Sequence, residues 1–232
     1  MATPLPTLET APGAIPLGPA MVRCTGRAEG DMADATGHDE HVLARRRSVV
    51  ARSWTWLRQV HGAEVVVVTH PGGSAGREAD AAVSDAAGVA LSVVTADCAP
   101  VALASPEGVI GVAHAGWRGL VAGVVEDTVA AMARLGASSV EAVIGPCIGP
   151  ECYQFGARDL DEVVARLGEE VRAETSSGRP ALDIPGATRA ALRRAGVDRV
   201  TDVGICTACS AEHWSWRARG DRQRQATVVW CP

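Results

Sequence analysis

The sequence predicts a single α+β domain in which sheets are covered by helices. Three observations support this class. The chain has 232 residues, which is long for one ordinary domain and short for two. Its apolar fraction of 47% is enough to bury a full core. Short apolar runs alternate along it with helical patterns. We therefore expect an irregular N-terminal arm over residues 1–20 and one domain over residues 21–232.

Four short apolar runs in the first half of the chain are typical of β-strands. They are rich in β-branched residues and end at Gly, Pro or Asp. Together they occupy about fifty residues, which leaves little room for crossover helices and predicts antiparallel or mixed pairing. The four runs are Val65–Thr69, Ala90–Thr95, Val101–Ala104 and Val109–Ala113.

The hydrophobic period becomes helical after Gly119. Apolar residues recur at helical spacing from Val121 to Leu135, and Gly136 follows as a helix-ending residue. Similar criteria predict strands at Val140–Gly145, Val200–Ile205 and Ala226–Trp230, helices at Ala157–Glu174 and Ala187–Ala195, and a loop at Thr175–Pro180.

Charge and termini argue against several classes of protein. The net charge of −5 opposes a general role in coating nucleic acid. The first twenty residues lack a positively charged segment and are interrupted by prolines, so we expect neither a signal peptide nor a membrane span. Seven cysteines, an odd number, suggest reduced thiols in a cytoplasmic protein. There is no lysine, so an anion site must use arginine or backbone N–H groups.

Candidate chemistry is concentrated at three strand boundaries. His61 precedes a strand in "LRQVHGAEV", Cys98 lies in "TADCAP" before Pro100, which predicts a strand end and a turn, and His114 ends a strand in "VAHAGWRGL". Two imidazoles and one thiolate suit a zinc ion whose fourth position is open. The spacing is not diagnostic, and from pattern alone a buried cysteine with two hydrogen-bonded histidines is the favoured interpretation.

A family resemblance changes that balance. The segments "RQVHGAEV", "TADCAP", "GVIGVAHAGWRGLVAGVVEDTV", "IGPCIGPECYQFG" and "CT…WSWRARGDRQRQA" together resemble the YfiH/YlmD laccase-domain family, formerly called multicopper polyphenol oxidases. The likeness runs in order over roughly three quarters of the chain, from Trp54 to Trp230. It implies mixed β-sheets packed as a sandwich with flanking helices, and metal ligands at His61, Cys98 and His114.

The function implied by the resemblance is phosphorolysis of adenosine, inosine, guanosine and methylthioadenosine, with secondary adenosine deamination. The expected cofactor is Zn²⁺, with Cu²⁺ as the alternative, and the expected partners are a purine nucleoside and phosphate, without nucleic acid or membrane. We expect a monomer. A copper-dependent polyphenol oxidase with four coppers would need many histidines, commonly as H-x-H, whereas this chain has six and no such pair. The "HDEH" at residues 38–41 lacks the zincin order.

The "AGWRGL" turn is the candidate anion site. A helix starts there with free N–H groups, and Arg118 adds a forked donor. Arg118 could instead pair with a carboxylate such as Glu126. Trp117 could stack on a base or belong to the core. Asp97 is the nearest carboxylate to Cys98 for acid–base chemistry, provided that "ADC" already belongs to a turn.

Further substrate contacts follow only from the resemblance. An arginine of an R-x-G-G-x-S motif corresponds to Arg27 in the altered segment "CTGRAEGDM". An aromatic-Ser-x-Arg segment followed by R-Q-A corresponds to Ser215, Arg217 and Arg224. A solvated basic turn between two strands is the competing interpretation of this C-terminal segment.

The remaining cysteines are interpreted as ordinary thiols. Cys206 and Cys209 form C-x-x-C, but only Cys231 and His213 lie close enough in sequence to complete a structural zinc site. Two other functions stay open. One is a cysteine hydrolase or amidase that edits peptidoglycan precursors with Cys98 and His114, as the family's links to cell-wall editing suggest. The other is a binding module that has lost its activity.

Overall fold

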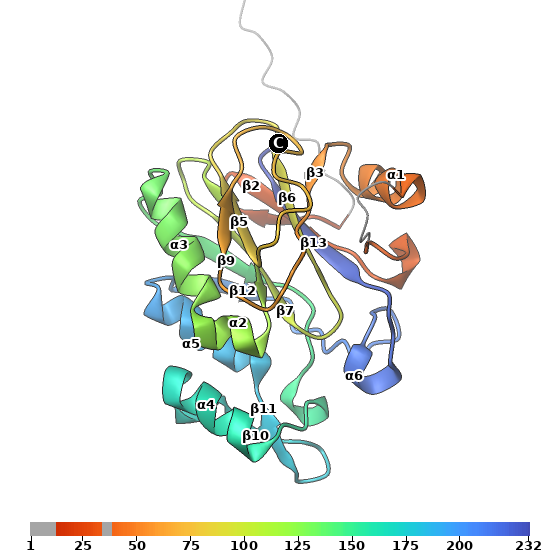
Figure 1. Cartoon of the computed structure of the whole chain (residues 1–232), viewed down its shortest axis with the longest axis vertical. Coiled ribbons are helices and arrows are strands. Elements are labelled where there is room, and N and C mark those ends of the chain that lie inside the picture. The colour runs from red at the N-terminus through yellow and green to blue at the C-terminus, as the bar shows by residue number, and fades with distance from the viewer. Residues whose placement is uncertain (1–12, 34–38) are drawn as a thin grey trace, which may run out of the picture.

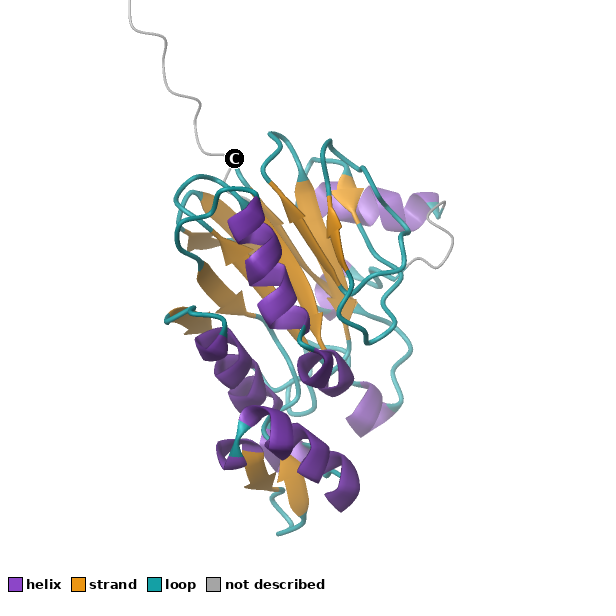
Figure 2. Ribbon diagram, turned by 60° about the vertical axis from the view of Figure 1, so that its left-hand side comes forward, coloured by secondary structure: helices purple, strands orange, loops and turns teal. Residues whose placement is uncertain are grey.

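Two mixed β-sheets pack face to face, and helices cover the outer face of the larger sheet (Figures 1 and 2). This arrangement is seen in a computed structural model that describes residues 13–33 and 39–232. It is the single α+β domain of mixed sheets and flanking helices that the sequence predicts. None of the helices in the described residues is long and apolar enough to cross a membrane.

The smaller sheet has five strands in the order β1-β2-β13-β6-β3. Strand β13 is central because it pairs antiparallel with both β2 and β6. The edge strand β3 pairs parallel with β6. The strand bounds are Ile15–Leu17 (β1), Ala20–Cys24 (β2), Trp54–Thr55 (β3), Ala90–Thr95 (β6) and Gln225–Trp230 (β13).

The larger sheet has six strands in the order β12-β9-β7-β8-β5-β4. Its centre is antiparallel, and its two edge strands pair parallel with their neighbours. The mixed pairing expected from the short connections is thus confirmed. The bounds are Val65–Val67 (β4), Ala81–Ser84 (β5), Ala99–Ala104 (β7), Ile110–Ala115 (β8), Glu141–Ile144 (β9) and Arg199–Asp202 (β12).

The helices divide between two faces of the sandwich. Helices α2, α3 and α5 pack against the larger sheet, α4 packs on α2 and α5, and α1 flanks the smaller sheet (Figure 1). The hairpin β10–β11 lies beside α4 at the lower end of Figure 1. The bounds are Glu40–Val49 (α1), Trp117–Ala122 (α2), Val124–Arg134 (α3), Ala157–Leu167 (α4), Ile184–Arg194 (α5), Trp216–Arg219 (α6), Arg172–Glu174 (β10) and Pro180–Leu182 (β11), with 3₁₀ turns at Arg27–Glu29 (η1), Pro150–Cys152 (η2) and Glu169–Val171 (η3).

Glycines explain two differences from the predicted helices. The helical period after Gly119 is split into α2 and α3 because Gly123 adopts a left-handed φ of 95°. The helix predicted over Ala157–Glu174 ends at Leu167 because Gly168, at a φ of 107°, turns the chain out of the helix. Residues with a side chain rarely adopt such angles, so glycine determines where these helices stop.

Two further expectations differ from the structure. Part of the predicted irregular arm is ordered, since β1 covers Ile15–Leu17 and pairs with β2, and residues 1–12 of that arm lie outside the described residues. Pro100 was expected to end a strand, but it lies near the start of β7, opposite His114. A proline is tolerated there because pairing with β9 begins only at Val101. His38 of the "HDEH" segment also lies outside the described residues.

Candidate metal centre and active-site pocket

Three predicted ligands meet at one end of the sandwich, two on segments that connect the sheets and one near the end of a strand. His61 lies between β3 and β4, and Cys98 lies between β6 and β7, so each is on a crossover from the smaller sheet to the larger one. His114 is the penultimate residue of β8. Their donor atoms lie within 4.8 Å of one another, and Cys98 Sγ is 3.8 Å from His61 Nε2.

A buried carboxylate that sequence analysis did not identify, Asp80, holds two of these ligands. The Nδ1 of His114 donates to Asp80 Oδ1 at 2.7 Å, which leaves Nε2 free for a metal. The backbone N–H groups of Val60, His61 and Gly62 also donate to the Asp80 carboxylate, at 3.1, 2.9 and 2.8 Å. Asp80 therefore orients one imidazole and fixes the loop that carries the other.

The His61 loop and the Cys98 turn both contain strained backbone. His61 has a φ of 61° and Asp97 a φ of 100°, two of the three positive values at non-glycine positions in the described chain. Such conformations cost on the order of 1–3 kcal/mol each and persist where surrounding contacts enforce them. At Asp97 those contacts include its carbonyl, which accepts from Ile148 N at 2.9 Å.

Gly116 makes room for the donor atoms. A Cβ at this position would lie 2.7 Å from His61 Cδ2 and 3.2 Å from Cys98 Sγ. The first distance is shorter than packed carbon atoms tolerate. The "HAGW" segment therefore supplies a ligand at His114 and, two residues later, the gap into which the other two ligands fit.

Electrostatics favour an ionised thiolate at Cys98. Burial opposes its ionisation, but the positive charge of His114 and hydrogen bonds from both imidazoles outweigh burial and lower the pKa of Cys98 to about 6. Burial also opposes protonation of His114, yet the Cys98 thiolate and the bond to Asp80 raise the pKa of His114 to about 9. A thiolate is the form of cysteine that binds metals. The His₂Cys set, with one coordination position left open, fits a catalytic zinc ion.

The three ligands open into a pocket of about 610 Å³. This volume lies in the range of small-molecule sites. Six arginines line the pocket, whereas Asp97 is the one acidic residue among the described lining residues, so the walls favour an anion. Four aromatic side chains offer flat surfaces. The arginines are 46, 58, 118, 217, 222 and 224, and the aromatic residues are Trp56, Trp117, Tyr153 and Trp216.

Two predicted substrate contacts, Arg118 and Arg217, reach this pocket. Arg118 is exposed, lies 4.4 Å above the Trp117 ring and makes no hydrogen bond or ion pair with the described part of the chain. The alternative partner Glu126 binds Arg166 instead, at 2.7 Å. Arg217 stacks 4.8 Å above the Tyr153 ring and donates to the carbonyl of Gln154.

Trp117 combines the two roles considered for it. It lines the pocket, and it also packs against the core with its ring centroid 5.5 Å from that of Phe155. Asp97 lines the pocket as well, and the "ADC" turn lies between β6 and β7 as its role requires. Its carboxylate, however, accepts from Thr207 Oγ1 at 2.7 Å and Arg217 N at 2.6 Å. Asp97 therefore fixes the pocket wall.

Of the other predicted substrate contacts, one lines the pocket and two do not. Arg224 lines it, with its guanidinium bonded to the carbonyls of residues 221–223. Ser215 is buried and caps α6 through a bond from Ala218 N. Arg27 stacks 4.0 Å above the Trp214 ring and pairs with Asp221, outside the residues that line the pocket. The structure thus brings Arg118, Arg217 and Arg224 to the pocket that the three candidate ligands line, but not Arg27 or Ser215.

A family model and several named proteins match most of the chain. Residues 17–232 match the family model described as multi-copper polyphenol oxidoreductase laccase. A protein of Streptomyces coelicolor named purine nucleoside phosphorylase is 41% identical over 209 residues, which cover 88% of this chain and 86% of the relative. One of the same name from Deinococcus radiodurans is 40% identical over 195 residues, 82% of this chain and 75% of the relative.

Solved structures show the same fold. YlmD from Geobacillus stearothermophilus superposes with a TM-score of 0.76 at 30% identity, covering 95% of this chain and 93% of that protein. The protein NMB0706 from Neisseria meningitidis superposes with a TM-score of 0.78 at 26% identity, covering 94% and 99% of the two chains.

Proposed function

Because the chain belongs to the multi-copper polyphenol oxidoreductase laccase family, we propose that it is a zinc-dependent purine nucleoside phosphorylase. Its proposed substrates are adenosine, inosine, guanosine or methylthioadenosine, together with phosphate. Relatives at about 40% identity that bear the phosphorylase name support this proposal. The single observation that carries it is a pocket lined both by six arginines and by His61, Cys98 and His114, three side chains that could hold a metal ion.

In the proposed reaction a phosphate oxygen bonds to the anomeric carbon of the sugar as the bond from that carbon to the base nitrogen breaks. The electron pair of the broken bond goes to the purine, which takes up a proton, and ribose 1-phosphate is the second product. The pocket must therefore hold a phosphate anion beside a sugar that develops positive charge. Cationic donors aimed at the phosphate align the two reactants and supply much of the catalysis.

We assign the phosphate to the side of the pocket formed by Arg118 and Arg217. Arg118 has an exposed guanidinium without a polar partner among the described residues, so its forked donors are free to bind phosphate oxygens. It lies at the start of α2, whose N-cap residue is Gly116, so no capping side chain occupies the first N–H groups of the helix. Arg217 is held in place by Gln154 and Tyr153.

We assign the purine to the aromatic walls. The Trp216 side chain is 54% exposed at the pocket, which is unusual for so large an apolar group. Trp117 and Tyr153 present further ring surfaces. A purine is flat and polarisable, so stacking on such rings binds it with little selectivity among bases. This arrangement is compatible with a broad purine specificity.

His61, Cys98 and His114 would hold the zinc ion, and Asp80 would keep His114 in the tautomer that binds it. Zinc held there would supply a Lewis acid at the wall of the substrate pocket. The adenosine deaminase activity is also proposed, as a secondary reaction in the same pocket. We propose that the protein acts as a monomer in the cytoplasm.

The test is to incubate purified protein with adenosine, with and without phosphate, and to measure adenine, ribose 1-phosphate, inosine and bound zinc. We expect phosphate-dependent release of adenine that is lost in His61→Ala, Cys98→Ala and His114→Ala. Matched controls are His70→Ala, whose ring contacts Thr69, and Cys231→Ala, whose thiol bonds to the carbonyl of Gly108. Zinc-loaded protein that turns over no purine nucleoside would refute the proposal.

The same assay separates the alternative of a cysteine hydrolase. Cys98 and His114 also form a thiolate–imidazolium pair, which is the nucleophile of such enzymes. A hydrolase would keep its activity after chelation and lose it on alkylation of Cys98, whereas the proposed phosphorylase loses activity on chelation and regains it with zinc. Arg118→Gln should raise the KM for phosphate by about 10- to 100-fold, the loss of a charge-assisted bond, whereas the exposed Arg134→Gln should leave it unchanged.

A further inference from the structure

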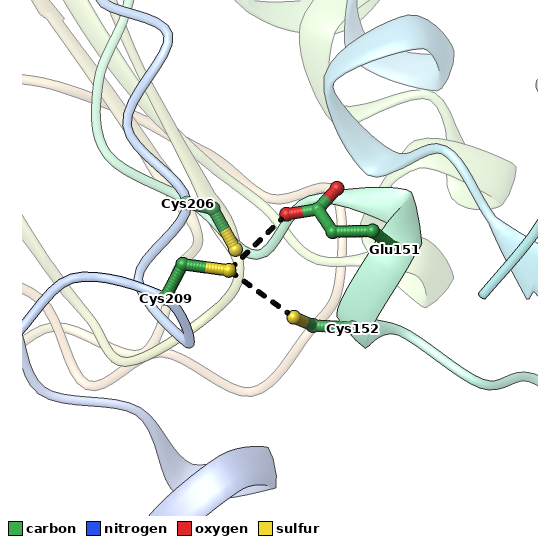
Figure 3. A group of neighbouring side chains, drawn as sticks. All are labelled: Glu151, Cys152, Cys206 and Cys209. Atoms are coloured by element: carbon green, nitrogen blue, oxygen red, sulfur yellow. Dashed lines mark hydrogen bonds between the residues drawn. The ribbon is translucent and has the colours of Figure 1, made fainter. Parts of the chain in front are cut away.

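A second group of metal-binding side chains lies outside the pocket. Among the described residues, Glu151, Cys152, Cys206 and Cys209 bring three thiols and a carboxylate to one place, with donor atoms that all lie within 4.8 Å of one another. Figure 3 shows the group converging from two segments, with the Cys209 sulfur in contact with both Cys152 and Glu151. The reaction proposed above uses none of the four residues.

Only half of this group, the C-x-x-C, is recognisable in the sequence. We expected the C-x-x-C of Cys206 and Cys209 to remain incomplete, since only Cys231 and His213 are near it in sequence. In the structure Cys231 bonds to the carbonyl of Gly108 and His213 bonds to Ser210. The other two members of the group, Glu151 and Cys152, come from η2 instead. Cys152 precedes Cys209 by 57 positions in the sequence.

The distances in the group suit tetrahedral coordination. Cys209 Sγ lies 3.4 Å from Cys152 Sγ and 3.6 Å from Glu151 Oε1. A zinc ion binds thiolates at about 2.3 Å, which places two sulfurs of a tetrahedron about 3.8 Å apart. The donor atoms thus already stand close to the separations that a central zinc ion requires, and small rotations of the side chains would complete the geometry.

Backbone contacts hold the two segments in register. Cys147 N donates to the carbonyl of Ile205 at 3.2 Å, and Thr207 N donates to the carbonyl of Cys147 at 3.0 Å. Gly149 N donates to Cys206 Sγ at 3.2 Å. An N–H group aimed at a sulfur stabilises the thiolate, which is the form that binds metal. The ligand positions are therefore set by the fold itself.

The donor set selects the ion. Three thiolates are soft ligands that favour zinc over magnesium or calcium, and four protein donors without an open position are the pattern of a structural site. Cys209 is exposed, and the other three residues are partly exposed, so an ion can enter from solvent. Arg219 donates to the carbonyls of Thr207 and Ala208, which places a positive charge beside the C-x-x-C turn.

We propose that Glu151, Cys152, Cys206 and Cys209 form a structural zinc site. A disulfide between Cys152 and Cys209 is the competing use of the same thiols, and it would leave Cys206 and Glu151 without a role. All four donors converge on one point, which a pairwise link does not require.

The site would clamp one wall of the pocket. Tyr153, directly after Cys152, lines the pocket, and Thr207, inside the C-x-x-C turn, donates to Asp97. Asp97 in turn accepts from the backbone of Arg217. Zinc bound between the two segments would therefore fix the distance between the Tyr153 ring and the Arg217 backbone. Loss of this zinc should make the part of the pocket wall formed by Tyr153 and Arg217 more mobile.

The experiment is a metal count on the full chain together with cobalt substitution. We expect two zinc ions per wild-type chain, one after the double change Cys206→Ser and Cys209→Ser, and two in the control Cys231→Ser. Thiolate-to-cobalt charge-transfer absorption grows with the number of Co–S bonds. Most of it should therefore disappear in the double variant, which loses a three-thiolate site, and little in Cys98→Ala, which loses a one-thiolate site.

A gentler variant covers the case in which the double change prevents folding. Glu151→Gln keeps all three thiols and should weaken the second zinc ion by more than about tenfold in a chelator competition, whereas the exposed Glu170→Gln should not. Equal zinc content in wild-type and double-variant protein would overturn the proposal. So would metal-free wild type with a Cys152–Cys209 disulfide, seen as a mass lower by two hydrogens. Neither result depends on nucleoside turnover.

Discussion

Replacing Asp80 with asparagine tests whether this buried carboxylate organises the metal centre. Asp80 is fully buried, and each of its two oxygens accepts two bonds: Oδ1 from His61 N and His114 Nδ1, and Oδ2 from Val60 N and Gly62 N. In asparagine one of these oxygens becomes an NH₂ group. Either orientation of the amide therefore turns two of the four donors toward another donor.

The expected loss follows from that count. The backbone donors are only partly buried, so each lost bond should cost about 0.5–1.5 kcal/mol, and two of them should lower the free energy of unfolding by about 1–3 kcal/mol. Loss of the carboxylate behind a metal-binding histidine typically weakens metal affinity by about 10- to 100-fold. Both effects act on the same loop, so Asp80→Asn should weaken zinc binding and destabilise the metal-free protein together.

Urea unfolding of the metal-free protein and zinc competition with a chromophoric chelator measure the two effects separately. Asp85→Asn is the matched control, since its side chain is exposed on the neighbouring segment. If Asp80→Asn bound zinc within twofold of wild type and unfolded at the same urea concentration, the carboxylate would not be the organising group and the reasoning would be refuted.

Two further predictions concern the same centre. Gly116→Ala places a Cβ 2.7 Å from His61 Cδ2 and should weaken zinc binding about tenfold or more. The control Gly156→Ala has open space around its Cβ and should bind zinc as the wild type does. Equal zinc affinities of the two variants in the chelator competition would contradict this prediction. In metal-free protein the pKa of Cys98 is lowered to about 6, so its thiolate fraction, and with it the rate of alkylation by iodoacetamide, should rise with pH around a midpoint near 6. Burial raises the pKa of Cys231, so Cys231 should react only at higher pH. Peptide mapping by mass spectrometry measures the alkylation of each cysteine, and a Cys98 midpoint above pH 8 would contradict the prediction.

The parts of the fold that sequence predicts well are those with a strong periodic signal. The run Ala90–Thr95 coincides with β6, and the helical period after Gly119 corresponds to α2 and α3. Strand β5, Ala81–Ser84, was missed because "AAVS" has a single β-branched residue. That omission also hid Asp80, which immediately precedes β5 and has no motif of its own.

The candidate site divides in the same way. Histidine and cysteine side chains at strand boundaries could be recognised in the sequence, and in the structure the donor atoms of His61, Cys98 and His114 lie within 4.8 Å of one another. Contacts between segments distant in sequence were not visible. Asp97 illustrates this, because its carboxylate faces Thr207, 110 residues away, and the N–H of Arg217, 120 residues away.

The sequence by itself determined the class of fold, because hydrophobic period is a local property of the chain. It also placed His61, Cys98 and His114 at strand boundaries, and their order within motifs that resemble one family pointed to a metal site. Only the tertiary structure decided which groups support and surround them. Crossovers between the two sheets bring His61 and Cys98 to His114, Asp80 binds both histidine segments from its place just before β5, and Glu151 and Cys152 lie beside a C-x-x-C far away in sequence. Such pairings depend on how the sheets pack and leave no fixed spacing in the chain.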